Sequence, residues 1–354
     1  MPHLFDPLTL RGVTFANRIW VSPMCQYSAK DGVVGDWHMV HLGSFATGGT
    51  GLIVAEATGV VPEGRISVGC PGLYNDLQVA AWKRVTDFVH SQGVKIGVQL
   101  AHAGRKGGAA HLGADHPIAT QEEGGWQTVA PSAIAFPGYP EPRELTTDEV
   151  KALVGSFGDA AKRAVTAGFD LVEIHAAHGY LIHEFYSPLS NTRTDEYGGS
   201  YENRTRLLKE ITAEVRSVIP ESMPLFVRIS ASDWTEGGWG EAESVRLAPE
   251  LTALGVDLID VSSGGNVAKA NITVGPGYQV HFADAVRNSG GATTSAVGMI
   301  TEPEQAEEIV ASGKADAVMM AREFLRNPRW PLEAAAALGQ EVAWPIQIVR
   351  GKRS

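Results

Sequence analysis

Residues 171–206 read LVEIHAAHGYLIHEFYSPLSNTRTDEYGGSYENRTR. At the start of this stretch, aliphatic residues alternate with Glu173 and His175, which is the period of a half-buried β-strand. His178 and Tyr180 follow directly in a turn that contains glycine. Two imidazoles and a phenol therefore come where a strand gives way to a loop, the place at which parallel α/β folds build their sites.

The rest of the chain repeats this pattern of short apolar strands separated by helix-patterned segments. Helical periodicity is clear at 77–93, 147–168 and 302–313, and each of these segments ends on glycine, as helices often do. Eight strands in continuous alternation with helices predict an α/β fold, a (β/α)8 TIM barrel, and favour it over a doubly wound open sheet. We find no composition break, so residues 1–354 are expected to form one domain. The predicted strands are 19–24, 51–57, 95–100, 171–176, 225–230, 258–263, 292–297 and 317–322.

Two segments lie outside this alternation. Residues 3–19, HLFDPLTLRGVTFANRI, alternate around Arg11 and Gly12 and predict a hairpin ahead of the barrel. Residues 101–145, after the third strand, are rich in Gly, Pro, Ala and His and are too long for an ordinary connection. They form either a structural loop or a lid over the barrel mouth, and the sequence favours neither.

Composition and charge exclude several classes of protein. The 354 residues are 44% hydrophobic, enough for a substantial core, and their formal net charge of -11 argues against a broad nucleic-acid interface. The two cysteines, Cys25 and Cys70, cannot make a disulfide framework or a four-cysteine metal or iron–sulfur site. We see no signal peptide and no apolar run long enough to span a membrane, so we expect a soluble, cytoplasmic protein.

The strand alternation also places polar side chains inside the barrel. Gln99, His175 and Arg228 lie opposite the aliphatic face of their strands, each near the C-terminal end, so we expect them to point inward. A buried arginine needs an anion or a strong acceptor. The sequence favours a bound anionic ligand as this partner. The alternative is a carboxylate of the chain, either Glu173 or Asp260, which the strand alternation also places inside the barrel.

The ends of the last two strands predict a phosphate site. Barrels often bind phosphate at the loops after strands seven and eight, where this chain has AVGMIT (296–301) and AREFLR (321–326). Gly298 allows close backbone approach, and Arg322 offers a forked pair of donors.

Together these motifs resemble a known family. The chain is similar to the old yellow enzyme family of FMN-dependent ene-reductases, and to its thermophilic-like class, which has Cys where the classical class has Thr after SPM. The resemblance covers nearly the whole chain. It is carried by SPMCQY (22–27), QLAHAGRK (99–106), APSAIAF (130–136), the run at 175–206 and AREFLR (321–326).

The resemblance implies an FMN-binding barrel with the flavin at its C-terminal mouth. By resemblance, Ala321 and Arg322 bind the phosphate, and Arg228 lies beside N1 and the ribityl chain. Further flavin contacts are implied for Ser22, Pro23, Met24, Cys25, Ala57 and Gln99. The substrate residues implied are His175 and His178 at a carbonyl oxygen, Tyr180 as proton donor and Tyr27 in the pocket wall.

The resemblance also implies an NAD(P)H oxidoreductase, with NADPH expected over NADH. Its substrates would be α,β-unsaturated ketones, aldehydes, imides or nitroalkenes, which receive hydride from flavin N5 at the β-carbon. Two imidazole donors suit the oxygen on which negative charge then develops. A phenol suits protonation at the α-carbon, because a pKa near 10 keeps it protonated at pH 7.

Two other classes remain open. His175, His178 and His183 form a loose zinc-like pattern, so a metal-dependent barrel hydrolase is one alternative, although no carboxylate motif completes such a site. A flavin-binding sensor without turnover is the other. Relatives that hold an iron–sulfur cluster are not expected, because the cysteines that they need are missing.

Neighbouring residues are assigned supporting parts. We interpret Cys70 as structural, and Trp37 and His38 as packing residues at a helix start. A polar network that fixes the loop is expected from Arg193, Asp195, Asn203 and Arg204.

Two departures from the family pattern matter. Ala321 stands where the family often has glycine, so its β-carbon could crowd the phosphate. Arg350 resembles the arginine that a neighbouring subunit inserts into the active site in this class, but the usual aromatic neighbours are replaced by Ile348 and Lys352. The resemblance therefore implies a homodimer or homotetramer, with Arg350 as the hypothetical inserted residue.

Overall fold

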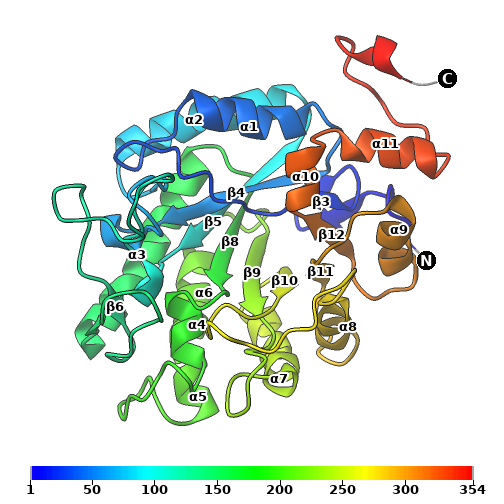
Figure 1. The fold of residues 1–354 in the computed structure, drawn as a ribbon. Helices are drawn as coiled ribbons and strands as arrows, with labels where there is room; N and C mark the ends of the chain where they lie inside the picture. The colour runs from blue at the N-terminus through cyan, green and yellow to red at the C-terminus, as the bar shows by residue number, and fades with distance from the viewer. Residues whose placement is uncertain (1, 353–354) are drawn as a thin grey trace.

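The computed structural model describes residues 2–352, and its centre is a closed barrel of eight parallel strands (Figure 1). Each barrel strand pairs with the next one along the chain, and the last pairs with the first. The predicted (β/α)8 barrel is therefore confirmed, and the open sheet is excluded. The strands are β3 Ile19–Val21, β4 Leu52–Gly59, β5 Lys95–Ala101, β8 Leu171–Ala176, β9 Leu225–Ser230, β10 Leu258–Ser262, β11 Thr294–Ala296 and β12 Ala317–Met320.

Helices surround the barrel. The N–H groups at the starts of α2 and α3 are capped by the side chains of Asn75 and Thr146, each within a capping box. The predicted helical segments match α2, α3 and α9 to within two residues at each end. No helix within residues 2–352 is long and apolar enough to cross a membrane. The helices are α1 Asp36–Ala46, α2 Asp76–Ser91, α3 Thr147–Thr166, α4 Leu181–Tyr186, α5 Tyr201–Arg204, α6 Arg206–Val218, α7 Glu241–Ala253, α8 Val280–Asn288, α9 Pro303–Ala311, α10 Arg322–Arg326 and α11 Trp330–Ala337.

An N-terminal hairpin covers one end of the barrel. β1 (Leu8–Leu10) and β2 (Val13–Phe15) pair antiparallel at the place where the sequence predicted a hairpin. Phe15 is fully buried, and its ring centre lies 5.0 Å from that of Trp20 and 6.3 Å from that of Phe226. Both partners point into the barrel, so the hairpin closes the end opposite the carboxyl ends of the strands.

The long segment after β5 is mostly irregular. It contains η2 (Gly104–Lys106) and the short parallel strands β6 (Val129–Ala130) and β7 (Arg143–Glu144). Its first residues pack against α4, where the N–H of Arg105 donates to Glu184 Oε1 at 2.9 Å. The segment therefore begins beside the loop that carries His178 and Tyr180.

The C-terminal segment follows a different course. Figure 1 shows the chain leaving the barrel surface after α11, with η3 (Val349–Gly351) near its end. Ile346 is 81% exposed and Val349 is 44% exposed. This segment thus presents apolar side chains to its surroundings.

The closure of the barrel by Phe15 can be tested by truncation. Phe15→Ala should lower the free energy of unfolding by about 3–5 kcal/mol, because it removes a buried ring and leaves a cavity. Urea denaturation followed by circular dichroism measures this change. Leu77→Ala, at a side chain that is 74% exposed, is the control and should change stability by less than about 0.5 kcal/mol. An equally small loss for Phe15→Ala would contradict the account.

Candidate active site

A layer of polar side chains crosses the barrel above its apolar end. Gln99 Nε2 donates to Glu173 Oε1 at 2.8 Å. Arg228 Nη1 donates to Ser22 Oγ at 2.9 Å, and Arg228 Nε lies 3.1 Å from Asp260 Oδ2. All five residues are buried. Gln99 and Arg228 thus face the interior, as the alternation predicted.

Asp260 corrects the expectation for the buried arginine. The sequence favoured a bound anion as the partner of Arg228, whereas in the structure the chain itself provides a carboxylate partner, the alternative that the sequence had left open. Asp260 also accepts a hydrogen bond from Ser295 Oγ at 2.9 Å. Burial, with the nearby Asp260, raises the pKa of Glu173 to about 8, so Glu173 is mostly protonated at neutral pH.

Three side chains lie above this layer at the mouth of the barrel. His175 is in β8, and His178 and Tyr180 follow in the turn before α4. The ring centre of His175 lies 5.2 Å from that of His178 and 5.1 Å from that of Tyr180, both in edge-to-face arrangements. His175 is buried, whereas His178 and Tyr180 are partly exposed. The structure therefore brings together the three residues that the sequence singled out for catalysis.

Hydrogen bonds define which nitrogen of each imidazole can donate. His175 Nδ1 accepts from the N–H of Ala177 at 3.3 Å, so Nε2 carries the ring proton. His178 Nε2 lies 2.8 Å from Ser262 Oγ, while Gln279 Oε1 is 3.4 Å from that hydroxyl. We therefore assign the Ser262 proton to the shorter contact, which leaves the ring proton of His178 on Nδ1.

The protonation states follow from burial. Burial, with a smaller effect of Arg228, lowers the pKa of both His175 and His178 well below the ordinary value. Burial also raises the pKa of Tyr180 well above that of a free phenol. The three groups are therefore two neutral imidazoles, each with one N–H, and one protonated phenol.

Lys106 holds the turn that carries these groups. His178 has a φ of 61°, and a β-carbon at Gly179 would lie 2.3 Å from Gly265 O, so glycine is required there. Lys106 Nζ donates to His178 O at 2.6 Å and to Gly265 O at 2.9 Å, and it lies 4.8 Å from the ring centre of Tyr180. Sequence reasoning gave Lys106 no role, because only the folded loops bring it to this turn.

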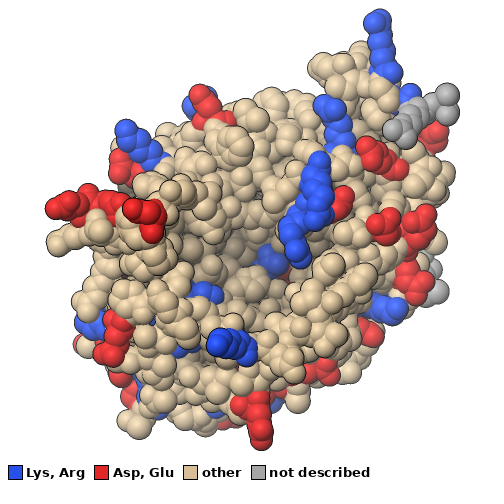
Figure 2. All heavy atoms as spheres, viewed as in Figure 1, with Lys and Arg blue, Asp and Glu red and all other residues tan. Residues whose placement is uncertain are grey.

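A hollow opens beside the last two barrel strands. It includes a cavity of about 200 Å³ whose lining contains Ser22, Arg228, Ser262, Gly298, Ala321 and Arg322. Figure 2 shows a depression in the centre of this face with basic side chains in it and beside it, while acidic side chains lie mainly toward the outline. An anionic ligand is therefore favoured here, although the net charge is -11.

The predicted cofactor residues all fall at the carboxyl end of a barrel strand or in the loop that follows it. Ser22 is buried, but the next residues, Pro23, Met24, Cys25 and Tyr27, are partly exposed. Ala57 is buried in β4, and Gln99 is buried in β5. Of the predicted cofactor residues, Ser22, Arg228, Gly298, Ala321 and Arg322 line the cavity, and the assignment of the whole set to the flavin remains a prediction.

These groups fit a flavin mononucleotide. Gln99 gives an amide N–H to Glu173, which leaves its carbonyl oxygen to accept a ring N–H. Gly298 has no side chain and a φ of 117°, and the exposed cation of Arg322 lines the same cavity, so both suit a phosphate. Ala321, the departure from the family pattern, is partly exposed at the cavity wall.

The zinc-like histidine pattern does not assemble. His183 Nδ1 accepts from the N–H of Gly179 at 2.9 Å, and its Nε2 lies 2.9 Å from Asp233 Oδ1. Both ring nitrogens are therefore engaged away from His175 and His178. The metal-dependent hydrolase loses the third ligand on which that alternative rested.

The supporting residues divide into two groups. Arg193 Nε donates to Asp195 Oδ1 at 3.0 Å and Arg204 Nε donates to Tyr186 O at 2.8 Å, so the predicted polar network exists. His38 is buried, but Trp37 is 56% exposed. The interpretation of Trp37 as a packing residue at the helix start is wrong, because more than half of its side chain is exposed.

The fold and the site define a flavin-dependent oxidoreductase of the TIM-barrel class. The profile of the NADH:flavin oxidoreductase / NADH oxidase family matches residues 3–341. The chain is 48% identical over 353 residues to an NADPH dehydrogenase of Geobacillus thermodenitrificans, with 99% of this chain and 98% of that one covered. It is 49% identical over 351 residues to an NADPH dehydrogenase of Bacillus subtilis, with 98% of each chain covered.

Solved structures give the same result. Morphinone reductase superposes with a TM-score of 0.80 at 31% identity, covering 97% of this chain and 91% of that one. 2-Naphthoyl-CoA reductase superposes with a TM-score of 0.87 at 28% identity, covering 96% of this chain, but this chain spans only 52% of it. The chain therefore belongs to the NADH:flavin oxidoreductase / NADH oxidase family and to its old yellow enzymes, and it is an FMN-dependent NAD(P)H oxidoreductase.

Glu184 provides a pH-dependent test of how the long insertion is attached. Burial raises the pKa of Glu184 from 4.5 to about 8. The folded protein keeps this proton to a higher pH than the unfolded chain, so the stabilisation is complete below about pH 4 and is lost as the pH rises to about 8. Relative to the wild type, Glu184→Gln should therefore gain unfolding free energy, by up to a few kcal/mol, between about pH 5 and pH 8 in urea titrations.

The matched control for this experiment is Glu63→Gln, at an exposed carboxylate in η1 (Pro62–Gly64). The difference in unfolding free energy between Glu63→Gln and the wild type should not change over the same pH range. A constant difference for Glu184→Gln as well would show that folding does not raise the pKa of Glu184.

Proposed function

We propose that the protein reduces activated carbon–carbon double bonds of α,β-unsaturated ketones, aldehydes, imides or nitroalkenes, with NADPH as the preferred reductant. The observation that carries this proposal is the pair of neutral imidazoles of His175 and His178, with Tyr180 beside them, at the mouth of a barrel that fits a flavin. The chemistry that FMN supplies when bound is hydride transfer to the β-carbon.

The histidines supply the electrophilic half of this site. His175 Nε2–H and His178 Nδ1–H would both donate to the carbonyl or nitro oxygen of the substrate. That oxygen gains negative charge as the β-carbon receives hydride, so the two hydrogen bonds strengthen toward the transition state. Each donor is expected to contribute about 3 kcal/mol.

Tyr180 supplies the proton. Its raised pKa keeps the phenol protonated, and the proton would pass to the α-carbon as the charge on the substrate develops. Lys106 lies 4.8 Å from the ring centre of Tyr180 and fixes the turn before it through the carbonyl of His178. The phenol is therefore presented by a rigid loop.

The insertion after β5 would act as a cover for the substrate. Lys106 Nζ lies 4.8 Å from the ring centre of Phe136, which belongs to this insertion, and 4.8 Å from that of Tyr180. One cation thus joins the insertion to the catalytic turn. This contact supports a lid over a purely structural loop, because a cover over the mouth excludes water from the reacting groups.

Removal of both histidines tests the assigned roles. The double variant His175→Ala/His178→Ala should lose enone turnover by a factor on the order of 10³ or more, because both oxygen donors are gone. Binding of phenol ligands should weaken, while FMN stays bound and is still reduced by NADPH in anaerobic stopped-flow experiments. His116→Ala, at a partly exposed histidine of the insertion, is the control. Full activity of the double variant would refute the roles.

The non-catalytic sensor is set aside, because the family assignment makes the chain an enzyme. For the assembly, we propose a homodimer or homotetramer in which Arg350 enters the active site of a neighbouring subunit. The proposal is supported by a C-terminal segment that leaves the barrel and exposes Ile346 and Val349 (Figure 1).

Arg350→Ala tests this arrangement. The substitution should raise the KM for enones several-fold, because a cationic wall of the pocket is lost, with little change in FMN affinity. Lys352→Ala, two residues further along, is the control and should leave KM unchanged. Enone kinetics of Arg350→Ala equal to those of the wild type would remove Arg350 from the active site.

A further inference from the structure

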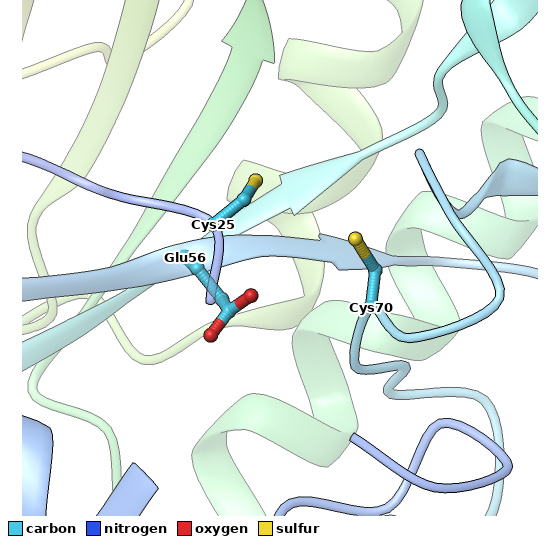
Figure 3. A group of neighbouring side chains, drawn as sticks. All are labelled: Cys25, Glu56 and Cys70. Atoms are coloured by element: carbon cyan, nitrogen blue, oxygen red, sulfur yellow. The ribbon is translucent and has the colours of Figure 1, made fainter. Parts of the chain in front are cut away.

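Two thiols and a carboxylate converge beside the active site. Cys25, Glu56 and Cys70 each offer one ligand atom, and these atoms lie within 4.8 Å of one another. Figure 3 shows the three side chains, which belong to the segment after β3, to β4 and to the loop after η1. We propose that they bind a thiophilic divalent cation of the zinc type, and that its binding inhibits the enzyme.

The spacing of the three atoms suits such a cation. Because no two of the three atoms are more than 4.8 Å apart, some point lies within about 2.8 Å of all of them, so small side-chain shifts reach the zinc bond lengths of about 2.0–2.3 Å. Cys70 is fully buried and Glu56 is 4% exposed, whereas Cys25 is partly exposed. Three protein ligands with one open position are a common zinc arrangement.

Glu56 is already held in place for such a role. The N–H of Gln26 donates to its Oε2 at 2.9 Å. His38 Nδ1 accepts from the N–H of Gly35 at 3.1 Å, so His38 Nε2 carries the proton, and this nitrogen lies 3.3 Å from Glu56 Oε1. A carboxylate ligand supported by outer hydrogen bonds is typical of metal sites.

A hydroxyl lies beside the buried thiol of the site. Cys70 Sγ is 3.4 Å from Ser67 Oγ, so Ser67 can donate a hydrogen bond to the sulfur when it binds a metal. Zinc binds thiolates, so its binding would release the thiol protons to solvent.

The proposed metal site lies close to the active-site tyrosines, so metal binding would affect catalysis. Cys70 belongs to a small buried cluster with Ala57 and Ala101, against which Cys25, Tyr27 and Tyr180 pack. A cation here would fix the Cys25 side chain and place a positive charge near Tyr180, which packs against the same cluster. We therefore expect an occupied site to slow alkene reduction.

Zinc titration of the holoenzyme tests the proposal. Calorimetry in the presence of a phosphine reductant, which keeps the thiols reduced, should show one zinc ion bound per chain. Cys70→Ser and Glu56→Gln should each weaken this binding by at least about 10- to 100-fold, the loss that even outer-shell changes cause. Glu63→Gln, at the exposed carboxylate of η1, is the control and should bind zinc like the wild type. Equal zinc affinity in Cys70→Ser and the wild type would overturn the proposal.

A second measurement covers the case in which a variant folds poorly. Cadmium bound by the wild-type protein should show the ultraviolet absorption of cadmium–thiolate bonds, and its absence would also overturn the proposal. Zinc should inhibit NADPH-dependent turnover of the wild type but not of Cys70→Ser, whose activity without metal should equal that of the wild type. Because the binding measurements need no turnover, their failure is distinguishable from failure of the proposed substrate class.

Discussion

The ion pair between Arg228 and Asp260 inside the barrel sets the conditions for the mouth above it. Removing one member of such a buried pair lowers the free energy of unfolding by about 3–5 kcal/mol. The pair therefore holds the guanidinium of Arg228 in one position inside the barrel, below the hollow. Ser22 accepts from the same guanidinium and ties β9 to the segment that follows β3. After burial, the charge of Arg228 is also the next cause that lowers the pKa of His175 and His178. One cation therefore suits the anionic cofactor and adds to the effect of burial, which keeps both imidazoles neutral.

The surroundings of Arg228 hold the side chains of the mouth in a defined arrangement. The hairpin closes one end of the barrel through Phe15, so the polar layer lies between an apolar plug and an open mouth. Above the layer, Lys106 ties the His178 turn to the loop after β10 through the carbonyls of His178 and Gly265. The two imidazoles and the phenol are thus presented by backbone that is held from two sides, which in the proposed reaction would limit reorganisation.

The sequence predicts those parts of the site that depend on local alternation. The inward positions of Gln99, His175 and Arg228 follow from the period of a strand alone. The identity of the partner of Arg228 does not follow from this period, because Glu173 and Asp260 both point into the barrel. The register decides it, since Arg228 pairs with Asp260 across β9 and β10, whereas Glu173 pairs with a phenylalanine of β9.

Contacts between loops cannot be predicted from the sequence, because they too depend on how distant segments are brought together. Lys106 and Ser262 act on His178 from segments far along the chain, and no periodicity brings them there. The prediction for Trp37 is wrong for a different reason. Its large apolar ring suggested a packing role, but the side chain is exposed and its indole N–H donates to Gln26 at the surface. Local patterns thus define the barrel, and the folded loops define how its mouth is held.

The midpoint potential of the bound FMN tests the central claim most directly. It should be measured in the wild type, Arg228→Lys and Arg228→Gln under anaerobic conditions. If Arg228 places its charge beneath the flavin, Arg228→Gln should lower the potential, because the reduced cofactor loses a nearby cation, and Arg228→Lys should keep most of the wild-type value. An unchanged potential in Arg228→Gln with FMN still bound would contradict the account.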